Sequence, residues 1–358
     1  MGLSFEELTG VADPSAGPRP AADPRRRVSM ADVAALAGVS GQTVSRVVNS
    51  SPRVDPDTRT RVEAAMAQLG YRPHRAARAL RTGRTQTLGL VVSTLATVGN
   101  SRMLQAVADA AATRGYALTV VTLTEGPATE PAAEPAVEIA RAFERLRDQG
   151  ADGAIVLNEA TAVARGATVP NDLELVVVDS PRDDRFGIVA TDHAGGARAA
   201  TEHLLAAGHS EVRHLGGPEQ SFAAAERERG WREALESHGA RSTPVLRGDW
   251  SAASGFSAGT LLAADDAVTA VFVANDQMAL GLLRALADAG RAVPMDVAVV
   301  GFDDIADAAD YRPPLTTVRQ DFDELGERAV ALLVDRIENV GAPRLEQVST
   351  RLIVRAST

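Results

Sequence analysis

The chain has 358 residues, a length typical of two or three domains. Hydrophobic residues make up 45% and charged residues 23%, the balance of a globular protein with sizeable cores. Cysteine is absent, which excludes disulfides, thiolate metal sites and cysteine nucleophiles. No apolar run approaches the ~18–20 residues of a membrane span, and residues 1–30 lack the apolar core of a signal peptide. We therefore expect a cytoplasmic protein without a membrane partner.

Charge is unevenly distributed along the chain. The 47 acidic and 37 basic residues give a net charge of −10. From Arg25 to Arg84, however, 12 arginines stand against four acidic residues, a net of +8, and the remainder carries −18. A basic block beside an acidic body predicts a nucleic-acid-binding head joined to a body with another task. A solvated basic tail is the alternative, but this block shows the apolar periodicity of folded helices.

Three helices are predicted after a disordered tail, residues 1–27, in which four prolines stand among small residues with little to bury. Apolar periodicity predicts helices over 30–37, 41 to about 49, and about 57 to 69, within a domain spanning 28–72. The predicted N-terminal caps are Ser29, Ser40, and Asp55 or Asp57. A helix, a short turn containing Gly38 and a second helix form the helix-turn-helix pattern. An ordinary three-helix bundle is the alternative.

The second helix of such a unit enters the major groove of DNA with its first residues at the base edges. Gly41, Gln42 and Arg46 are the predicted base-reading residues, because Gln pairs with adenine and Arg with guanine. Phosphate contacts position the protein without specifying sequence. We predict them for four hydroxyl or amide side chains: Ser29, Thr43, Ser45 and Asn49.

The segment 73–85 is rich in alanine and arginine and is too short to form a stable helix alone in water. It would fold only against DNA or a second copy of itself. Leu80 is its lone large apolar residue and is predicted to wedge between base steps in the minor groove. A plain linker with a chance leucine is the alternative.

The rest of the chain alternates buried strand patterns with helical patterns. Strands are predicted at residues 87–93, 117–123, 153–158, 173–180, 212–216, 269–276 and 297–304. Helices are predicted at residues 101–114, 136–149, 194–207, 223–238, 252–262, 277–289 and 323–338. This alternation predicts an α/β fold with parallel, doubly wound sheets, in two lobes that meet near 187–191. A late strand at 315–319 and a final strand at 348–354 suggest that the chain crosses back between the lobes.

Ligands of open α/β sheets bind beyond the carboxyl ends of the strands. Those ends carry acids and amides: Asn158, Asp179, Asn275, Asp276, Asp303 and Asp304. Phosphate-loop, nucleophile-elbow, dinucleotide and metal-ligand motifs are not found, so no cofactor or metal is expected. Carboxylates, amides, an arginine and a tryptophan suit a polyhydroxylated ligand, because the polar groups bond hydroxyls and the aromatic face covers C–H groups.

The stretch VSMADVAALAGVSGQTVSRVVN, followed by VDPDTRTRVEAAMAQLGYRPHRAARALRTGRT, resembles the head and hinge of the LacI/GalR family of bacterial transcription regulators. GDWSAASGF, VANDQMALG, VVGFDD and PPLTTVRQDFDELG continue the match, which covers nearly everything after residue 27. The resemblance implies two periplasmic-binding-protein-like lobes with a ligand cleft between them. We expect one lobe over 86–190 with 319–343 and the other over 191–318 with 344–358.

The family motifs imply an effector pocket. Trp250 corresponds to the ring-stacking residue, and Arg227 to the arginine that grips sugar hydroxyls. The other implied pocket residues are Asn275, Asp303, Asp179, Asn158, Gln320 and Phe322. Each has a structural alternative, such as a helix cap for Asn275, a turn for Asp303 or a surface ion pair for Arg227. Gly41 departs from the larger side chain usual in the family, which puts one base contact in doubt.

The resemblance predicts a homodimeric regulator, a repressor of sugar-utilisation genes, that a sugar releases from a pseudo-palindromic duplex operator. The motifs favour a β-galactoside, and a β-glucoside such as cellobiose comes next. No enzymatic activity is expected. The alternatives are a sugar-binding module without a regulatory role and a sugar-processing enzyme using Asp303 and Asp179 as acid and base, although nothing places that pair at glycosidase spacing.

Overall fold

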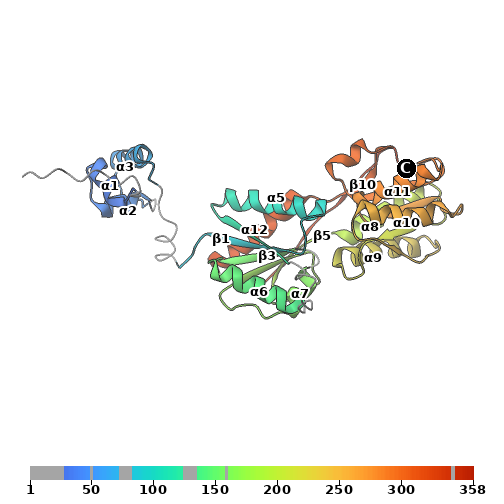
Figure 1. Ribbon diagram of the computed structural model, residues 1–358, viewed down its shortest axis with the longest axis horizontal. Coiled ribbons are helices and arrows are strands. Elements are labelled where there is room, and N and C mark those ends of the chain that lie inside the picture. Colours follow the sequence, from blue (N-terminus) through green and yellow to red (C-terminus); the bar gives the residue numbers. More distant parts are fainter. Residues whose placement is uncertain (1–27, 49–50, 72–82, 124–134, 158–159, 340–342) are drawn as a thin grey trace, which may run out of the picture. The chain divides into compact units, whose positions relative to one another are not determined.

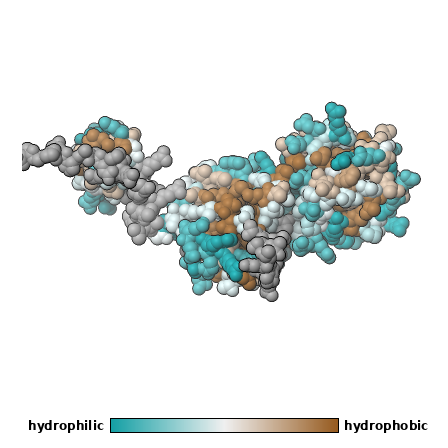
Figure 2. Space-filling view, in the orientation of Figure 1, coloured by the Kyte–Doolittle hydropathy of each residue, from teal (hydrophilic) through white to brown (hydrophobic). Residues whose placement is uncertain are grey.

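The computed structural model describes residues 28–48, 51–71, 83–123, 135–157, 160–339 and 343–358. The chain divides into two compact units, with the boundary between Gly83 and Arg84 (Figure 1). The predicted N-terminal tail, Asn49, Leu80 and Asn158 lie outside the described residues. On the face shown in Figure 2, hydrophilic residues are distributed over both units, and none of the described helices is long and apolar enough to cross a membrane.

The first unit contains the three predicted helices: α1 (Met30–Ala37), α2 (Gly41–Val48) and α3 (Pro56–Leu69). Ser29 and Asp32 form a reciprocal capping box at the start of α1. Ser40 accepts a hydrogen bond from the Thr43 N–H in α2, and Asp55 accepts one from the N–H of Thr58 in α3. Gly38 ends α1 in the left-handed conformation, which a residue without a β-carbon adopts at little cost.

A small apolar core holds these helices together. Val33 of α1, Val44 of α2 and Val62 of α3 are fully buried, and Tyr71 packs against the same cluster. Because α2 is amphipathic, burying Val44 and Val47 leaves its opposite face exposed to solvent. The core thus fixes which face of α2 is presented outward.

The second unit contains two six-stranded sheets. The alternating pattern predicted parallel sheets in two lobes, but it did not predict the strands at 187–191, 246–247 and 345–348. The first sheet is parallel throughout and has the order β11 (Leu345–Val348), β5 (Gly187–Thr191), β4 (Glu174–Val178), β3 (Gly153–Leu157), β1 (Thr87–Val92), β2 (Ala117–Thr122). The second has the order β12 (Arg351–Ile353), β10 (Thr316–Arg319), β9 (Ala298–Asp303), β8 (Ala270–Val273), β6 (Arg213–Gly216), β7 (Leu246–Arg247). In this sheet β12 runs antiparallel to β10 and the other pairs are parallel.

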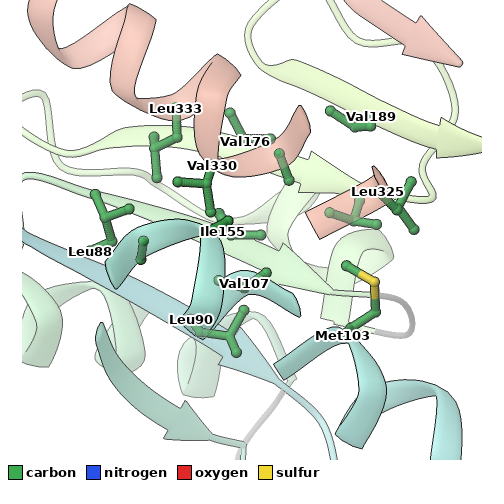
Figure 3. Packing of buried hydrophobic residues seen from close by; sticks show 14 of the residues in the cluster. Leu88, Leu90, Met103, Val107, Ile155, Val176, Val189, Leu325, Val330 and Leu333 are labelled. Atoms are coloured by element: carbon green, nitrogen blue, oxygen red, sulfur yellow. The ribbon is translucent and has the colours of Figure 1, made fainter. Parts of the chain in front are cut away.

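Helices cover both faces of each sheet and define the two lobes. In the first lobe, α5 (Val98–Thr113) and α12 (Phe322–Asn339) cover one face, and α6 (Pro135–Asp148) and α7 (Ala160–Gly166) cover the other (Figure 1). Figure 3 shows the core under α5 and α12, where Leu88, Leu90, Ile155 and Val176 of the strands meet Met103 and Val107 of α5 and Leu325, Val330 and Leu333 of α12. This apolar packing is the main stabilising contribution to the lobe.

The second lobe has the same layered construction. Helices α8 (His193–Ala206) and α9 (Phe222–Ser237) cover one face of its sheet, and α10 (Ala252–Ala263) and α11 (Asp276–Asp288) cover the other. A β-carbon at Gly255 or Gly281 would overlap the facing helix backbone, so these glycines permit the close packing of α10 on α11. A 3-10 turn, Ala306–Asp310, precedes β10.

Within the described residues the chain passes between the lobes three times: after β5, after β10 and after β11. After β11, which pairs with β5 in the first lobe, the chain enters β12, which pairs with β10 in the second. The predicted final strand 348–354 contains β12 and only the last residue of β11. The segment 344–358 thus contributes one strand to each sheet.

Candidate DNA-contacting and ligand-binding sites

The outward face of α2 carries the predicted base-reading residues. Gly41, Gln42 and Arg46 are all exposed, whereas Val44 and Val47 of the same helix are buried. Residues four apart lie on the same helix face, so Gln42 and Arg46 project together. Apart from its chain neighbours and its own helix backbone, no described heavy atom lies within 4 Å of the point where a β-carbon of Gly41 would stand, so the start of this face is open.

The hydroxyls predicted to contact phosphate differ in their present partners. Ser29 Oγ donates to Asp32 Oδ2 at 2.6 Å and so is engaged in the cap of α1. Thr43 Oγ1 lies 3.0 Å from Ser40 Oγ within the cap of α2. Ser45 is half-buried on the same helix. Cap formation and phosphate contact therefore compete for two of these side chains.

A cavity of about 50 Å3 lies where strands of both lobes end. The first lobe contributes Thr97, Gly99, Asn100, Met103, Asp179, Phe322 and Leu325 to its lining. The second lobe contributes Ser221, Ala223, Arg227, Trp250, Asn275 and Asp303, and Gln320 lines it from the passage after β10. The wall thus combines apolar side chains with acids, amides and one arginine.

Seven of the eight predicted effector residues line this one cavity, and the eighth, Asn158, lies outside the described residues. The side chains of Asp276 and Asp304 bond other residues instead. The Asp276 carboxylate accepts hydrogen bonds from Thr317 and the Ile305 N–H, and Asp304 pairs with Arg319 and Arg355. No residue on the α5 side of the wall was among the predicted site residues, because 96–100 matches the family motifs weakly.

A ring of polar contacts joins the lobes at the cavity. Thr191 donates its backbone N–H to Asp179 Oδ1 at 2.8 Å and its hydroxyl to Gln320 Oε1 at 3.2 Å. Gln320 Nε2 donates to Asp303 Oδ1 at 2.7 Å, and Arg227 Nη2 lies 3.4 Å from the same oxygen. His193, which sequence analysis did not single out, closes the ring between Arg227 and Asp179. Thr191 and His193 flank the passage after β5, and Gln320 lies in the passage after β10.

Arg227 is buried and held on three sides. Its Nε donates to His193 Nδ1 at 3.3 Å, its Nη1 donates to the Ala274 carbonyl, and its Nη2 approaches Asp303. The guanidinium carbon also lies 3.9 Å from the Phe302 ring centroid. A guanidinium has five N–H donors, so two remain for a ligand in the cavity. Their fork geometry suits two neighbouring oxygens.

Asn275 caps the start of α11, which was the structural alternative given for this residue. Its Oδ1 accepts from the N–H of Met278, and its Nδ2 donates to the Trp250 carbonyl at 3.1 Å. The cap and the cavity role are compatible, because the amide keeps one N–H and one lone pair. Asn275 thereby fixes the backbone of the residue expected to stack on a sugar ring.

Three cavity residues adopt the left-handed backbone region that side chains disfavour: Asp179 at φ +55°, Trp250 at +74° and Asp303 at +113°. Such conformations persist where the surroundings over-determine them and are concentrated at ligand sites. The ladder bond from the Asp179 N–H to Val189 and the Asn275–Trp250 bond supply part of that support.

The two carboxylates of the ring differ in proton affinity. Burial raises the pKa of Asp303 to about 6, although Arg227, His193 and Gln320 favour its ionised form. Burial also opposes ionisation of Asp179, but His193 and the Thr191 N–H hold its pKa below the ordinary value. Both groups are therefore mainly carboxylates at neutral pH, able to accept hydrogen bonds from hydroxyls.

The fold and the cavity define a class of proteins, in which a helix-turn-helix unit is joined to a two-lobed, periplasmic-binding-protein-like body. Residues 29–74 match the model of the bacterial regulatory proteins of the lacI family, and residues 201–358 match the periplasmic binding protein-like domain. The lactose operon repressor of Escherichia coli strain K12 is 36% identical over 335 residues, which cover 92% of this chain and 91% of the repressor. The chain belongs to the lacI family.

Solved structures agree with this assignment. A lac repressor dimer bound to operator and the anti-inducer ONPF is similar with a TM-score of 0.78 and 34% identity, covering 93% of this chain and 99% of that one. The complex of the transcriptional regulator CelR with cellobiose is similar with a TM-score of 0.67 and 36% identity, covering 93% of this chain and 100% of that one. No group of three or more His, Cys, Asp or Glu suited to a metal ion occurs among the described residues.

Proposed function

We propose that this chain is a DNA-binding transcription repressor whose grip on its operator is controlled by a sugar. The observation that carries the proposal is the presence, in one chain, of an exposed α2 face bearing Gln42 and Arg46 and of the polar cavity around Arg227. The lac repressor structure bound to operator supports the DNA partner, and the CelR–cellobiose complex supports a sugar ligand.

On this proposal two copies of the chain bind a pseudo-palindromic duplex in the cytoplasm, with Gly41, Gln42 and Arg46 at the bases. Dimers of helix-turn-helix proteins place two heads one helical turn apart, which matches the symmetry of such sites. Ser29, Thr43, Ser45 and Asn49 contact phosphates, and Leu80 wedges the central step.

The sugar occupies the cavity, stacks on Trp250 and bonds Asp179, Asn275, Asp303 and Arg227, with Gln320, Phe322 and Asn158 around it. A β-galactoside is the favoured effector and a β-glucoside such as cellobiose is the second candidate. Sugar and operator affect each other by the same factor, because linkage is reciprocal, and typical coupling is about 1–3 kcal/mol. No chemical step is assigned to Asp179 or Asp303, whose oxygens bond neighbouring groups.

The test starts with a random duplex library, from which the purified protein selects its preferred site. A mobility shift on that site is then titrated with lactose, cellobiose, galactose and glucose. We expect one of the disaccharides to release the duplex. A protein that selects no site, or whose site is held unchanged in saturating sugar, contradicts the proposal.

The Trp250→Ala variant tests the response to sugar separately from DNA binding. We expect the variant to bind the selected site like the wild type and to lose the response to sugar, because the stacking surface is gone. Loss of both activities would indicate misfolding, which thermal unfolding detects. Retention of the full sugar response would remove Trp250 from the ligand site.

A further inference from the structure

His193 is buried at the first position of α8, where the chain has just passed from the first lobe to the second. Its Nδ1 accepts a hydrogen bond from Arg227 Nε at 3.3 Å, and its Nε2 lies 3.1 Å from Asp179 Oδ1. Arg227 belongs to the second lobe and Asp179 to the first. The imidazole therefore touches one cavity side chain from each lobe.

The hydrogen-bonding state of the ring follows from its partners. An arginine Nε can only donate, so Nδ1 presents a lone pair to Arg227, and the ring proton lies on Nε2, which is 3.1 Å from Asp179 Oδ1. One nitrogen thus orients a cation and the other approaches an anion. An aliphatic side chain of similar size supplies neither contact.

The Nδ1 contact bears on ligand affinity. With Nε tied to His193 and Nη1 tied to the Ala274 carbonyl, the guanidinium plane has one orientation, and its two remaining donors are fixed before a ligand arrives. Holding a binding group in place beforehand lowers the entropy cost of binding. The Nε2 contact concerns the coupling between sugar binding and operator binding, because it links the ligand-binding arginine to the other lobe through Asp179.

We propose that His193 is a positioning residue with two separable tasks: its Nδ1 aligns Arg227 for the sugar, and its Nε2 transmits sugar occupancy to the lobe arrangement through Asp179. This inference rests on the proposed function and adds the residue through which the cavity is coupled to the body. A buried histidine that merely fills space would have no use for two polar partners of opposite charge.

Two amide substitutions keep one contact each. The Asn side chain in His193→Asn reaches the position of Nδ1 and can accept from Arg227, but it falls short of Asp179. The Gln side chain in His193→Gln reaches the position of Nε2 and can donate to Asp179, but offers Nδ1 no replacement. His193→Leu removes both contacts, and His238→Asn, at an exposed position at the end of α9, is the matched control.

Isothermal titration with lactose and with cellobiose measures the sugar Kd of each full-length protein, free and saturated with its selected duplex. The ratio of the two Kd values is the coupling factor. We expect His193→Asn to bind sugar within about threefold of the wild type but with a coupling ratio near one. We expect His193→Gln to keep the ratio and lose about tenfold or more in affinity, the usual effect of losing a hydrogen bond to a charged group. His193→Leu should lose both, and His238→Asn neither.

Thermal unfolding and operator affinity without sugar are measured alongside. If His193 only fills space, the three His193 variants lose sugar affinity in proportion to the fall in their melting temperatures. The Asn variant then does not lose coupling selectively, and the Gln variant does not lose sugar affinity selectively. That result overturns the proposal. A wild type that responds to a disaccharide while the Asn and Gln variants coincide refutes only the role of His193. A wild type that binds neither disaccharide refutes the proposed function itself, and the role of His193 with it.

Discussion

The indole ring of Trp250 lies against the backbone of Gly217, in the space that a β-carbon at that position would occupy. The same ring faces the Arg227 guanidinium, whose carbon is 5.5 Å from the ring centroid. Gly217 follows β6, and Trp250 follows β7, the neighbouring strand. Trp250 can therefore occupy its place in the pocket because Gly217, at the end of the neighbouring strand, has no side chain.

Gly217→Ala should displace the Trp250 ring and weaken sugar binding by about tenfold, because a stacking surface works only at contact distance. Operator affinity without sugar should stay unchanged, since α2 belongs to the other unit. Titration calorimetry and the mobility shift measure the two quantities. Gly166→Ala is the control, because a β-carbon there meets no atom within 4 Å. Unaltered sugar affinity in Gly217→Ala would show that the ring position is unimportant.

Gly41 has open space around it at the start of the exposed α2 face that we propose reads bases. Gly41→Ala should leave the fold intact and stabilise the head by up to about 1 kcal/mol, because glycine loses more backbone entropy in a helix than alanine does. Gly41→Gln should add a preference at one base pair of the selected site. Urea unfolding and repeated library selection test these expectations, and an unchanged site preference in Gly41→Gln would remove position 41 from the DNA contact.

Arg46→Ala should cost about 1–3 kcal/mol of discrimination at one base pair, because a bidentate contact to guanine is lost. Arg61→Ala removes an exposed charge from α3 and should weaken binding to all duplexes alike. Competition between the selected site and single-base variants distinguishes the two effects. Equal behaviour of both variants would mean that Arg46 contributes charge alone.

Sugar affinity should depend on pH through Asp303. The pKa of this buried carboxyl is about 6, and a sugar hydroxyl donates best to the ionised form. Affinity should therefore be full near pH 7.5 and fall as the pH drops below about 6. Asp303→Asn does not titrate, so its weaker binding should change less over this range. Calorimetry at several pH values measures both proteins, and parallel curves would exclude Asp303 as the titrating acceptor.

Stability should show the opposite trend for the same group. Because its folded-state pKa lies above the ordinary 3.8, Asp303 stabilises the fold most below pH 3.8, and this contribution is lost as pH rises through about 6. The free energy of unfolding of the wild type, relative to that of Asp303→Asn, should thus decrease by about 1 kcal/mol between about pH 5 and 7. Urea unfolding at the two pH values tests this, and a difference independent of pH would contradict it.

Local patterns account for the parts of the fold that sequence analysis predicted. The capping box of Ser29 and Asp32 and the left-handed Gly38 depend only on residues close in the chain, so the start and end of α1 were predicted correctly. The alternation of buried strands and helices likewise predicted the layered lobes. The family motifs around Trp250, Asn275 and Asp303 named side chains that line the cavity, and all three stand at or just after the carboxyl end of a strand.

What the sequence determined by itself was the order and type of most elements, since capping and periodicity act over a few residues. Only the tertiary structure decided which side chains meet. Thr191 bonds Gln320 across 129 positions, and His193 reaches Arg227 across 34, contacts that no local pattern contains. It also decided that β11 and β12 join different sheets. The physical reason is that these contacts form where the chain passes between the lobes and residues remote in sequence become neighbours.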